Sequence, residues 1–205
     1  MHALIFEMEL RDGHEEHYFQ HAAKLRPILM QHDGLIYIER FKSLTRPNVI
    51  LSHSLWRDEA SIARWRTNSE HHKSQIAGRF QHFQDYRIRI SHVLRYTDLN
   101  APAQEWSNGG SYSAPNLRTD RFIAILRSRK QLYNQDGDTF ASVTETDSYL
   151  TVLDIANEVD GQSKIKEVQG DVSVLTTLLA RVSRDYGLYD RTQAPQYFKA
   201  VEKSD

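Results

Sequence analysis

The first half of the chain carries strand and helix signals in an order that few folds satisfy. Apolar and polar residues alternate in Leu35–Phe41 and in Val49–Trp56, which predicts two strands joined by a short turn. Asp58 is a good N-cap for a helix that begins directly after the second of these strands. A further strand over Asp85–Tyr96 closes the segment.

The flanking residues complete the order β-α-β-β-α-β. Ala3–Leu10 alternates as a strand, and a helix follows the Asp12-Gly13 turn and runs to about Gln31. Ser69 is expected to cap a second short helix that ends at Gly78. This order is typical of a ferredoxin-like split βαβ unit, in which helices cover one face of the sheet.

The second half is interpreted as a degenerate copy of the first. Residues 100–120 are rich in Pro, Gly, Ser and Asn and are expected to link a first domain (1–99) to a second unit (121–193), followed by a tail (194–205). The expected elements are strands at Phe122–Ser128, Thr139–Thr146 and Tyr149–Ala156, a helix at Asn157–Gln169 and a strand at Val172–Tyr186. Arg129–Asp138 is too short for a full helix, and a direct hairpin there would reverse the strand direction relative to a helix-linked pair.

Composition excludes several classes of function. A hydrophobic content of 40% with 26% charged residues fits a soluble globular protein. The net charge of −1 gives no electrostatic reason to expect nucleic acid or an anionic membrane as a partner. The chain has no cysteine, so it has no disulfide or thiolate site. Because the first residues alternate like a strand and no apolar run is long enough for a membrane span, a cytoplasmic protein is expected.

Histidine and tryptophan are confined to one part of the chain. All 10 histidines and all 3 tryptophans precede Ser107. Imidazole is the side chain whose ordinary pKa suits acid-base work near neutral pH. The candidate chemistry is therefore placed in the first domain.

With these residues in view, the first domain resembles the antibiotic biosynthesis monooxygenase (ABM) family of dimeric α+β barrel proteins. The residues that carry the resemblance are Gly34-Leu35-Ile36, Trp56-Arg57-Asp58-Glu59-Ala60, Trp65-Arg66, Glu70-His71 and Asp85-Tyr86-Arg87-Ile88, with Arg184–Pro195 similar to the tail of such proteins.

The resemblance implies a sheet whose open face packs on a partner sheet to close a barrel, with a ligand cavity between each sheet and its helices. The partner is either a second copy, in a homodimer, or the second unit, in an intrachain pseudo-dimer. Family members that act on polycyclic phenols deprotonate the substrate so that its anion reacts with O2, without metal or flavin. Other members bind and degrade haem.

Trp65 and His71 are the leading site candidates that the resemblance implies. Trp65 aligns with a tryptophan that lines the family's cavity, where a flat ring suits stacking on an aromatic ligand. His71 is the candidate general base, with His72 beside it as a substrate-binding or haem-ligating alternative. Asn68 is a candidate polar partner for the substrate. The alternative is that Trp65 fills the core and both histidines are solvated.

Residues on the strands are further candidates. His53 alternates with apolar residues on one strand, and His92 does so on another, so each either assists catalysis, binds substrate or is a hydrogen-bonded core residue. Tyr37 is a candidate substrate-binding hydroxyl or a core aromatic. His14, His17 and His21 share one helix face at a spacing that can bind a transition metal, but no carboxylate motif accompanies them and no metal site is expected.

Two departures weigh against haem degradation. Haem-degrading relatives carry an asparagine on the first strand where this chain has Phe6, and a helix histidine where it has Gln75. The sequence therefore predicts an α+β protein built from tandem ferredoxin-like units. We expect a cofactor-independent monooxygenase that uses O2 on a small aromatic or quinol-like substrate. The alternatives are a non-enzymatic small-molecule binding protein and a haem-binding or haem-degrading monooxygenase.

Overall fold

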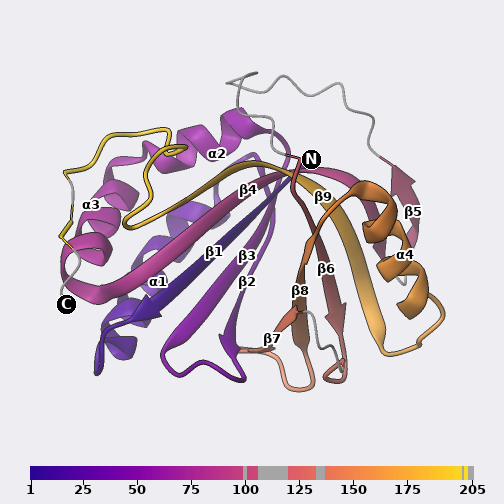
Figure 1. Ribbon diagram of the computed structural model, residues 1–205. Coiled ribbons are helices and arrows are strands. Elements are labelled where there is room, and N and C mark those ends of the chain that lie inside the picture. The colour runs from indigo at the N-terminus through magenta and orange to yellow at the C-terminus, as the bar shows by residue number, and fades with distance from the viewer. Residues whose placement is uncertain (99–100, 106–119, 133–136, 200, 203–205) are drawn as a thin grey trace.

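The computed structural model describes residues 1–98, 101–105, 120–132, 137–199 and 201–202 (Figure 1). In chain order the elements are β1 (His2–Leu10), α1 (Glu15–Met30), β2 (Leu35–Ser43), β3 (Val49–Trp56), α2 (Glu59–Arg66), α3 (Ser69–Ala77), the π-helical turn η1 (Gly78–His82), β4 (Phe83–Asp98), β5 (Ala101–Glu105), β6 (Phe122–Ser128), β7 (Gly137–Ser142), β8 (Tyr149–Ile155), α4 (Glu158–Val168) and β9 (Val174–Gly187). No helix in these ranges is both long and apolar enough to cross a bilayer.

All the strands except β5 form one closed antiparallel barrel of eight strands. The order around it is β1-β3-β2-β7-β8-β6-β9-β4, and pairing of β4 with β1 closes the ring. The strands of the first half follow the order β2-β3-β1-β4, and those of the second half repeat it as β7-β8-β6-β9. The chain therefore supplies both halves of an α+β barrel by itself, which confirms the expected fold class.

Two seams of unequal length join the halves. Between β4 and β9 the pairing runs from Arg87 opposite Gly187 to Asp98 opposite Thr176, whereas β2 and β7 pair only around Lys42 opposite Ala141. Strands β6 and β7 are both antiparallel to β8, so they run in the same direction and do not form a hairpin. The second half thus keeps the strand directions of the first without a described helix between its first two strands.

Side chains along each strand point alternately into the barrel and out of it. This separates a core inside the barrel from two cores on its outer surface, one on each half. Side chains such as Ile5, Leu51 and Phe140 fill the barrel interior. On the outside, α1 and α2 pack on the first half, and α4 packs on the second, as Figure 1 shows. The first-half outer layer is the one that holds the main cavity described below.

Side-chain caps hold the N-termini of α2, α3 and α4. The carboxylate of Asp58 accepts from the backbone N–H of Ser61, which confirms the predicted N-cap of α2. The predicted cap of α3 was wrong by one residue, because Asn68 rather than Ser69 holds that position. Strand β5 lies within the expected linker and pairs with the end of β4, while residues 106–119 of that linker lie outside the described residues.

Candidate functional site

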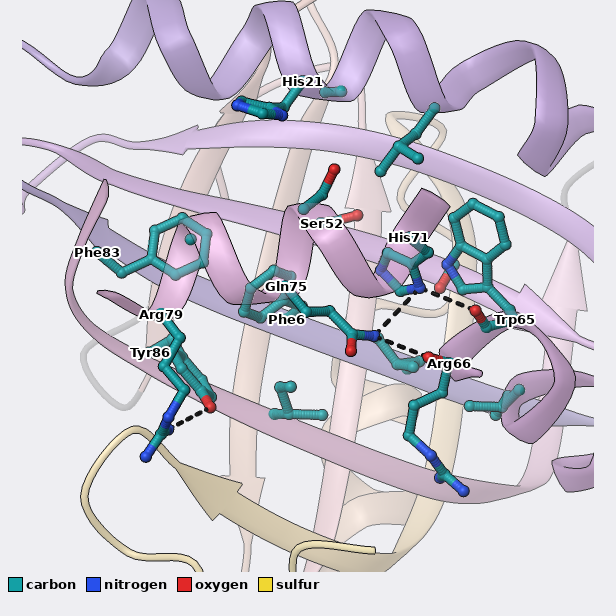
Figure 2. Close-up of a pocket in the computed structure, with 18 of the residues that line it drawn as sticks. Phe6, His21, Ser52, Trp65, Arg66, His71, Gln75, Arg79, Phe83 and Tyr86 are labelled. Atoms are coloured by element: carbon teal, nitrogen blue, oxygen red, sulfur yellow. Dashed lines mark hydrogen bonds between the residues drawn. The ribbon is translucent and has the colours of Figure 1, made fainter. Parts of the chain in front are cut away.

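A cavity of about 200 Å³ lies between the outer face of the first half-sheet and the helices α1, α2 and α3 (Figure 2). Its walls are mostly apolar, and its floor is formed by outward-facing residues of the strands. Apolar and aromatic lining residues include Leu4, Phe6, Leu25, Ile38, Trp56, Ile62, Trp65, Phe83, Ile88 and Ile90. Such a concave apolar space with a few polar groups is the usual form of a small-molecule site.

His71 and Trp65 meet in this cavity. The imidazole stacks on the indole with ring centroids 4.3 Å apart and planes 16° apart. Nδ1 of His71 lies 2.9 Å from the backbone carbonyl oxygen of Trp65, as Figure 2 shows. Because a carbonyl oxygen only accepts, Nδ1 carries the proton and Nε2 keeps its lone pair. Burial lowers the pKa of His71 to about 4, so the imidazole is neutral at physiological pH.

Gln75 links this pair to the C-terminal segment. Its side-chain nitrogen lies 3.3 Å from Nδ1 of His71 and donates to the backbone carbonyl of Arg66 at 3.1 Å, as Figure 2 shows. Its oxygen accepts from the amide of Gln196 at 3.0 Å. Phe198, two residues further on, also lines the cavity and stacks on His72 at a centroid distance of 5.7 Å. The end of the chain therefore forms one wall of the cavity.

The charged residues that line the cavity are all basic. They are Arg40, Arg66, Arg79 and Arg191, and no aspartate or glutamate is among the described residues of the lining. The Arg79 side chain is 2% exposed and donates to three neutral oxygens, those of the Tyr86 hydroxyl and the Leu188 and Lys199 carbonyls. Its Nε–H group has no partner in the described chain. A buried cation without a counter-ion is costly, so this wall favours an anionic ligand group.

Tyr86 is held between two of these arginines. Its hydroxyl oxygen accepts from Arg79 at 3.0 Å and from Arg191 at 2.9 Å. With both lone pairs used, the hydroxyl hydrogen is left for donation.

His53 and Tyr37 lie on the opposite side of the same sheet, inside the barrel. They line a separate cavity of about 460 Å³ with Tyr96 and Arg127. The ring of Tyr37 packs edge-on against that of His53 with centroids 5.4 Å apart, and its hydroxyl donates to the buried carboxylate of Glu39. Burial, and then the charge of Arg127, lowers the pKa of His53 to about 3. The structure thus brings these two candidates together but separates them from Trp65 and His71.

The remaining candidates lie outside the main cavity's lining. Asn68 caps α3, because its side-chain oxygen accepts from the backbone N–H groups of Glu70 and His71. His72 is exposed and reaches the cavity only through Phe198. His92 is buried on β4 with its ring 5.2 Å from that of His2.

Sequence reasoning missed Arg79, Tyr86 and Arg191 as lining residues. Tyr86 belongs to the Asp85–Ile88 segment that carries the family resemblance, so a signal existed for it. Arg191 belongs to the Arg184–Pro195 segment that is similar to the family's tail, whereas Arg79 carried no local signal. The place of both arginines depends on how the end of the chain docks on η1 and β4.

The residues present suit haem poorly. Both positions at which the sequence departs from haem-degrading relatives, Phe6 and Gln75, face the cavity. The space of about 200 Å³ is below the roughly 300–1,000 Å³ of pockets that enclose drug-sized ligands, and haem is larger than those.

Comparison with known proteins identifies the family. The sequence model described as "Antibiotic biosynthesis monooxygenase" matches residues 1–77. The jasmonate monooxygenase ABM of Pyricularia oryzae is 31% identical over 218 residues, which cover 97% of this chain and 98% of that protein. Among solved structures, an aldoxime dehydratase has a TM-score of 0.52 at 7% identity, covering 88% of this chain and 80% of its own. A candidate monooxygenase from Lactobacillus acidophilus NCFM has a TM-score of 0.45 at 8% identity, covering 90% and 94%. The chain is therefore a member of the antibiotic biosynthesis monooxygenase family.

Proposed function

We propose that this protein is a monooxygenase that places one atom of O2 on a small hydrophobic carboxylic acid held in the cavity beneath α1–α3. The observation that carries the proposal is the buried guanidinium of Arg79, which lines an apolar cavity without a carboxylate partner in the described chain. The relative from Pyricularia oryzae is named for jasmonate, which is an apolar ketone with a carboxylate. An apolar body and one negative charge match the cavity's walls and its arginines.

His71 is the candidate base in this reaction. Its Nε2 lone pair is free to take a proton from a carbon beside the substrate's carbonyl group, and the resulting imidazolium would be stabilised by the substrate anion. Hydroxylation of a C–H bond by O2 forms C–OH and water and consumes two electrons and two protons. A two-electron donor of the nicotinamide or ascorbate class must therefore accompany such a substrate.

A second candidate substrate is an aromatic or quinol-like molecule. The stacked Trp65 and His71 rings favour it, because the indole offers a flat apolar surface beside the base. Such a substrate supplies its own electrons, since a hydroquinone and O2 give a hydroxyquinone and water. No added reductant is then needed. The two candidate substrates therefore differ in whether oxygenation depends on a reductant.

The test is O2 uptake and product mass with jasmonate, its methyl ester and a panel of quinols, each with and without reductant. The proposal predicts oxygenation of the acid, weaker binding of the ester and dependence on reductant. Preference for quinols without reductant supports the second candidate. Ligand-dependent stabilisation without O2 uptake identifies a non-enzymatic binding protein.

Arg66 provides a variant for the charge requirement. It lines the cavity, and its guanidinium has no hydrogen bond or ion pair among the described residues, so Arg66→Gln removes charge without breaking a contact. Loss of one charge-assisted hydrogen bond predicts a KM for the acid raised roughly 10- to 100-fold, with the ester unchanged. The matched control is Arg64→Gln on the same helix, where Arg64 is exposed and paired with Asp33.

A further inference from the structure

Four histidines form a cluster at the edge of the main cavity that the proposed reaction does not use. Three of them, His14, His17 and His21, come from α1 or its N-cap position, and His82 comes from η1. His21 and His82 also line the cavity. Figure 2 shows His21 on its helix at that side of the cavity. The spacing in the sequence predicted that His14, His17 and His21 share one helix face. The fold adds His82, which lies 61 positions after His21 in the chain.

The rings of His14, His17 and His82 are mutually close. Their centroids are 5.7 Å apart for His14 and His17, 5.2 Å for His14 and His82, and 5.7 Å for His17 and His82. Imidazoles that bind one tetrahedral ion at a metal–nitrogen distance of about 2.0–2.1 Å have ring centroids roughly 5.2 Å apart. The three rings therefore lie close enough for side-chain rotation to direct their nitrogens at one ion, although the described side chains do not yet form a metal-binding group and the planes of His17 and His82 are nearly parallel, 16° apart.

Rotation of the side chains is needed to complete the arrangement. The Nδ1 atoms of His14 and His82 are 2.9 Å apart and share a hydrogen, whereas ligands of one tetrahedral ion have nitrogens about 3.3 Å apart. His21 has its ring centroid 5.5 Å from that of His82, so it is positioned as a fourth ligand. His17 is exposed and the other three are half-buried, so a change of rotamer displaces little packing.

The chemistry of the cluster selects the kind of ion. None of the four histidines pairs with a carboxylate among the described residues, and the contact between His14 and His82 is the one side-chain hydrogen bond that they make there. An all-nitrogen donor set suits Zn²⁺, Co²⁺, Ni²⁺ or Cu²⁺, whereas Mg²⁺ and Ca²⁺ require oxygen ligands.

We propose that the chain binds one divalent transition-metal ion of the Zn²⁺ class through His14, His17 and His82, with His21 or a water molecule in the fourth position. The ion joins α1 to η1 at the edge of the cavity. It stabilises the folded chain, because the ligands are brought together only when α1 and η1 are in place. This inference is independent of the proposed oxygenation.

The test is calorimetric titration of full-length, untagged, chelator-treated protein with Zn²⁺ and with Co²⁺, together with the Co²⁺ absorption spectrum. The expected result is one saturable equivalent, a visible spectrum of a tetrahedral nitrogen site, a raised melting temperature with Zn²⁺, and no effect of Mg²⁺. His17→Ala, on the exposed face of α1, and His82→Ala should each weaken binding by roughly tenfold or more.

The matched control is His72→Ala, which removes an exposed histidine outside the cluster and should leave the affinity unchanged. Absence of saturable binding overturns the proposal. So does unchanged affinity in His17→Ala, which keeps the test decisive if His82→Ala proves unstable.

Discussion

The imidazole of His71 lies flat against the indole of Trp65 and is tied by Nδ1 to the carbonyl oxygen of the same residue. The two residues lie on different helices, and the turn between them is fixed by the side chain of Asn68. This cap accepts the backbone N–H of His71 itself, so the start of α3 is oriented with His71 facing back over α2. The same set of contacts therefore fixes the ring orientation and tautomer of His71 and the direction of the first turn of α3.

Replacing His71 with alanine should remove most of the activity and little of the stability. General bases contribute about 10²- to 10⁴-fold, so kcat for the preferred substrate should fall within that range. The measurement is kcat alongside the melting temperature, with His72→Ala as control. Unchanged kcat in His71→Ala would exclude His71 as the base.

Asn68→Ala should act on both stability and catalysis. Loss of an N-cap costs about 1 kcal/mol, and the less ordered start of α3 should lower kcat through a poorly positioned His71. Asn68→Asp keeps the accepting oxygen and should restore both quantities. Denaturant unfolding and kcat for the two variants check this, and a kcat loss that Asp does not rescue would indicate that the Asn68 amide contacts substrate directly.

The stability of the fold should decrease in mild acid. Burial lowers the pKa of His2 and His71 to about 4 and that of His53 to about 3, whereas the unfolded value is about 6.5. Below pH 6.5 the unfolded chain therefore binds more protons than the folded chain, so stability is complete above this pH and is lost as the pH falls toward 4. Each histidine contributes about 1–2 kcal/mol to this loss at pH 5.

Urea unfolding at pH 7.5 and pH 5.0 measures this dependence, and His53→Leu supplies the comparison. Leucine suits the barrel interior, so this variant should lose less stability on acidification than the wild type. An equally steep pH dependence in His53→Leu would show that His53 does not contribute.

Most strands and the cap of α2 were predictable from local pattern, whereas the cap of α3 and the composition of the cavity were not. The predicted strands Val49–Trp56 and Phe122–Ser128 match β3 and β6, because short runs rich in apolar residues between turn segments leave little freedom there. Alternation places His53 and Trp56 on opposite faces of β3, but it does not tell which face lies inside the barrel.

Long-range docking accounts for the rest. Gln196 bonds to Gln75 across 121 positions, and the Arg79 guanidinium reaches the Leu188 carbonyl across 109 positions. The hydrophobic periodicity of the sequence does not indicate such long-range contacts. The cavity's C-terminal wall and its buried cation therefore became visible only in the folded chain.

The second half should be an integral part of the fold. Phe140 on β7 is 0% exposed and packs in the barrel interior beside the short seam with β2. Phe140→Ala should cost about 3–5 kcal/mol of unfolding free energy, whereas Val159→Ala, at a residue 74% exposed on α4, should change it little. Denaturant unfolding followed by Trp fluorescence, to which Trp56 and Trp65 of the first half contribute, is the test. An unchanged Trp transition in Phe140→Ala would mean that the halves unfold independently.

The central claim is that the chain oxygenates a small hydrophobic acid. Its most direct test is mass spectrometry of the products after incubation with jasmonate, a two-electron reductant and ¹⁸O-labelled O2. The account predicts a product that contains one labelled oxygen atom, formed at a much lower rate by His71→Ala. A bound but unchanged acid, or a product without label, would contradict it.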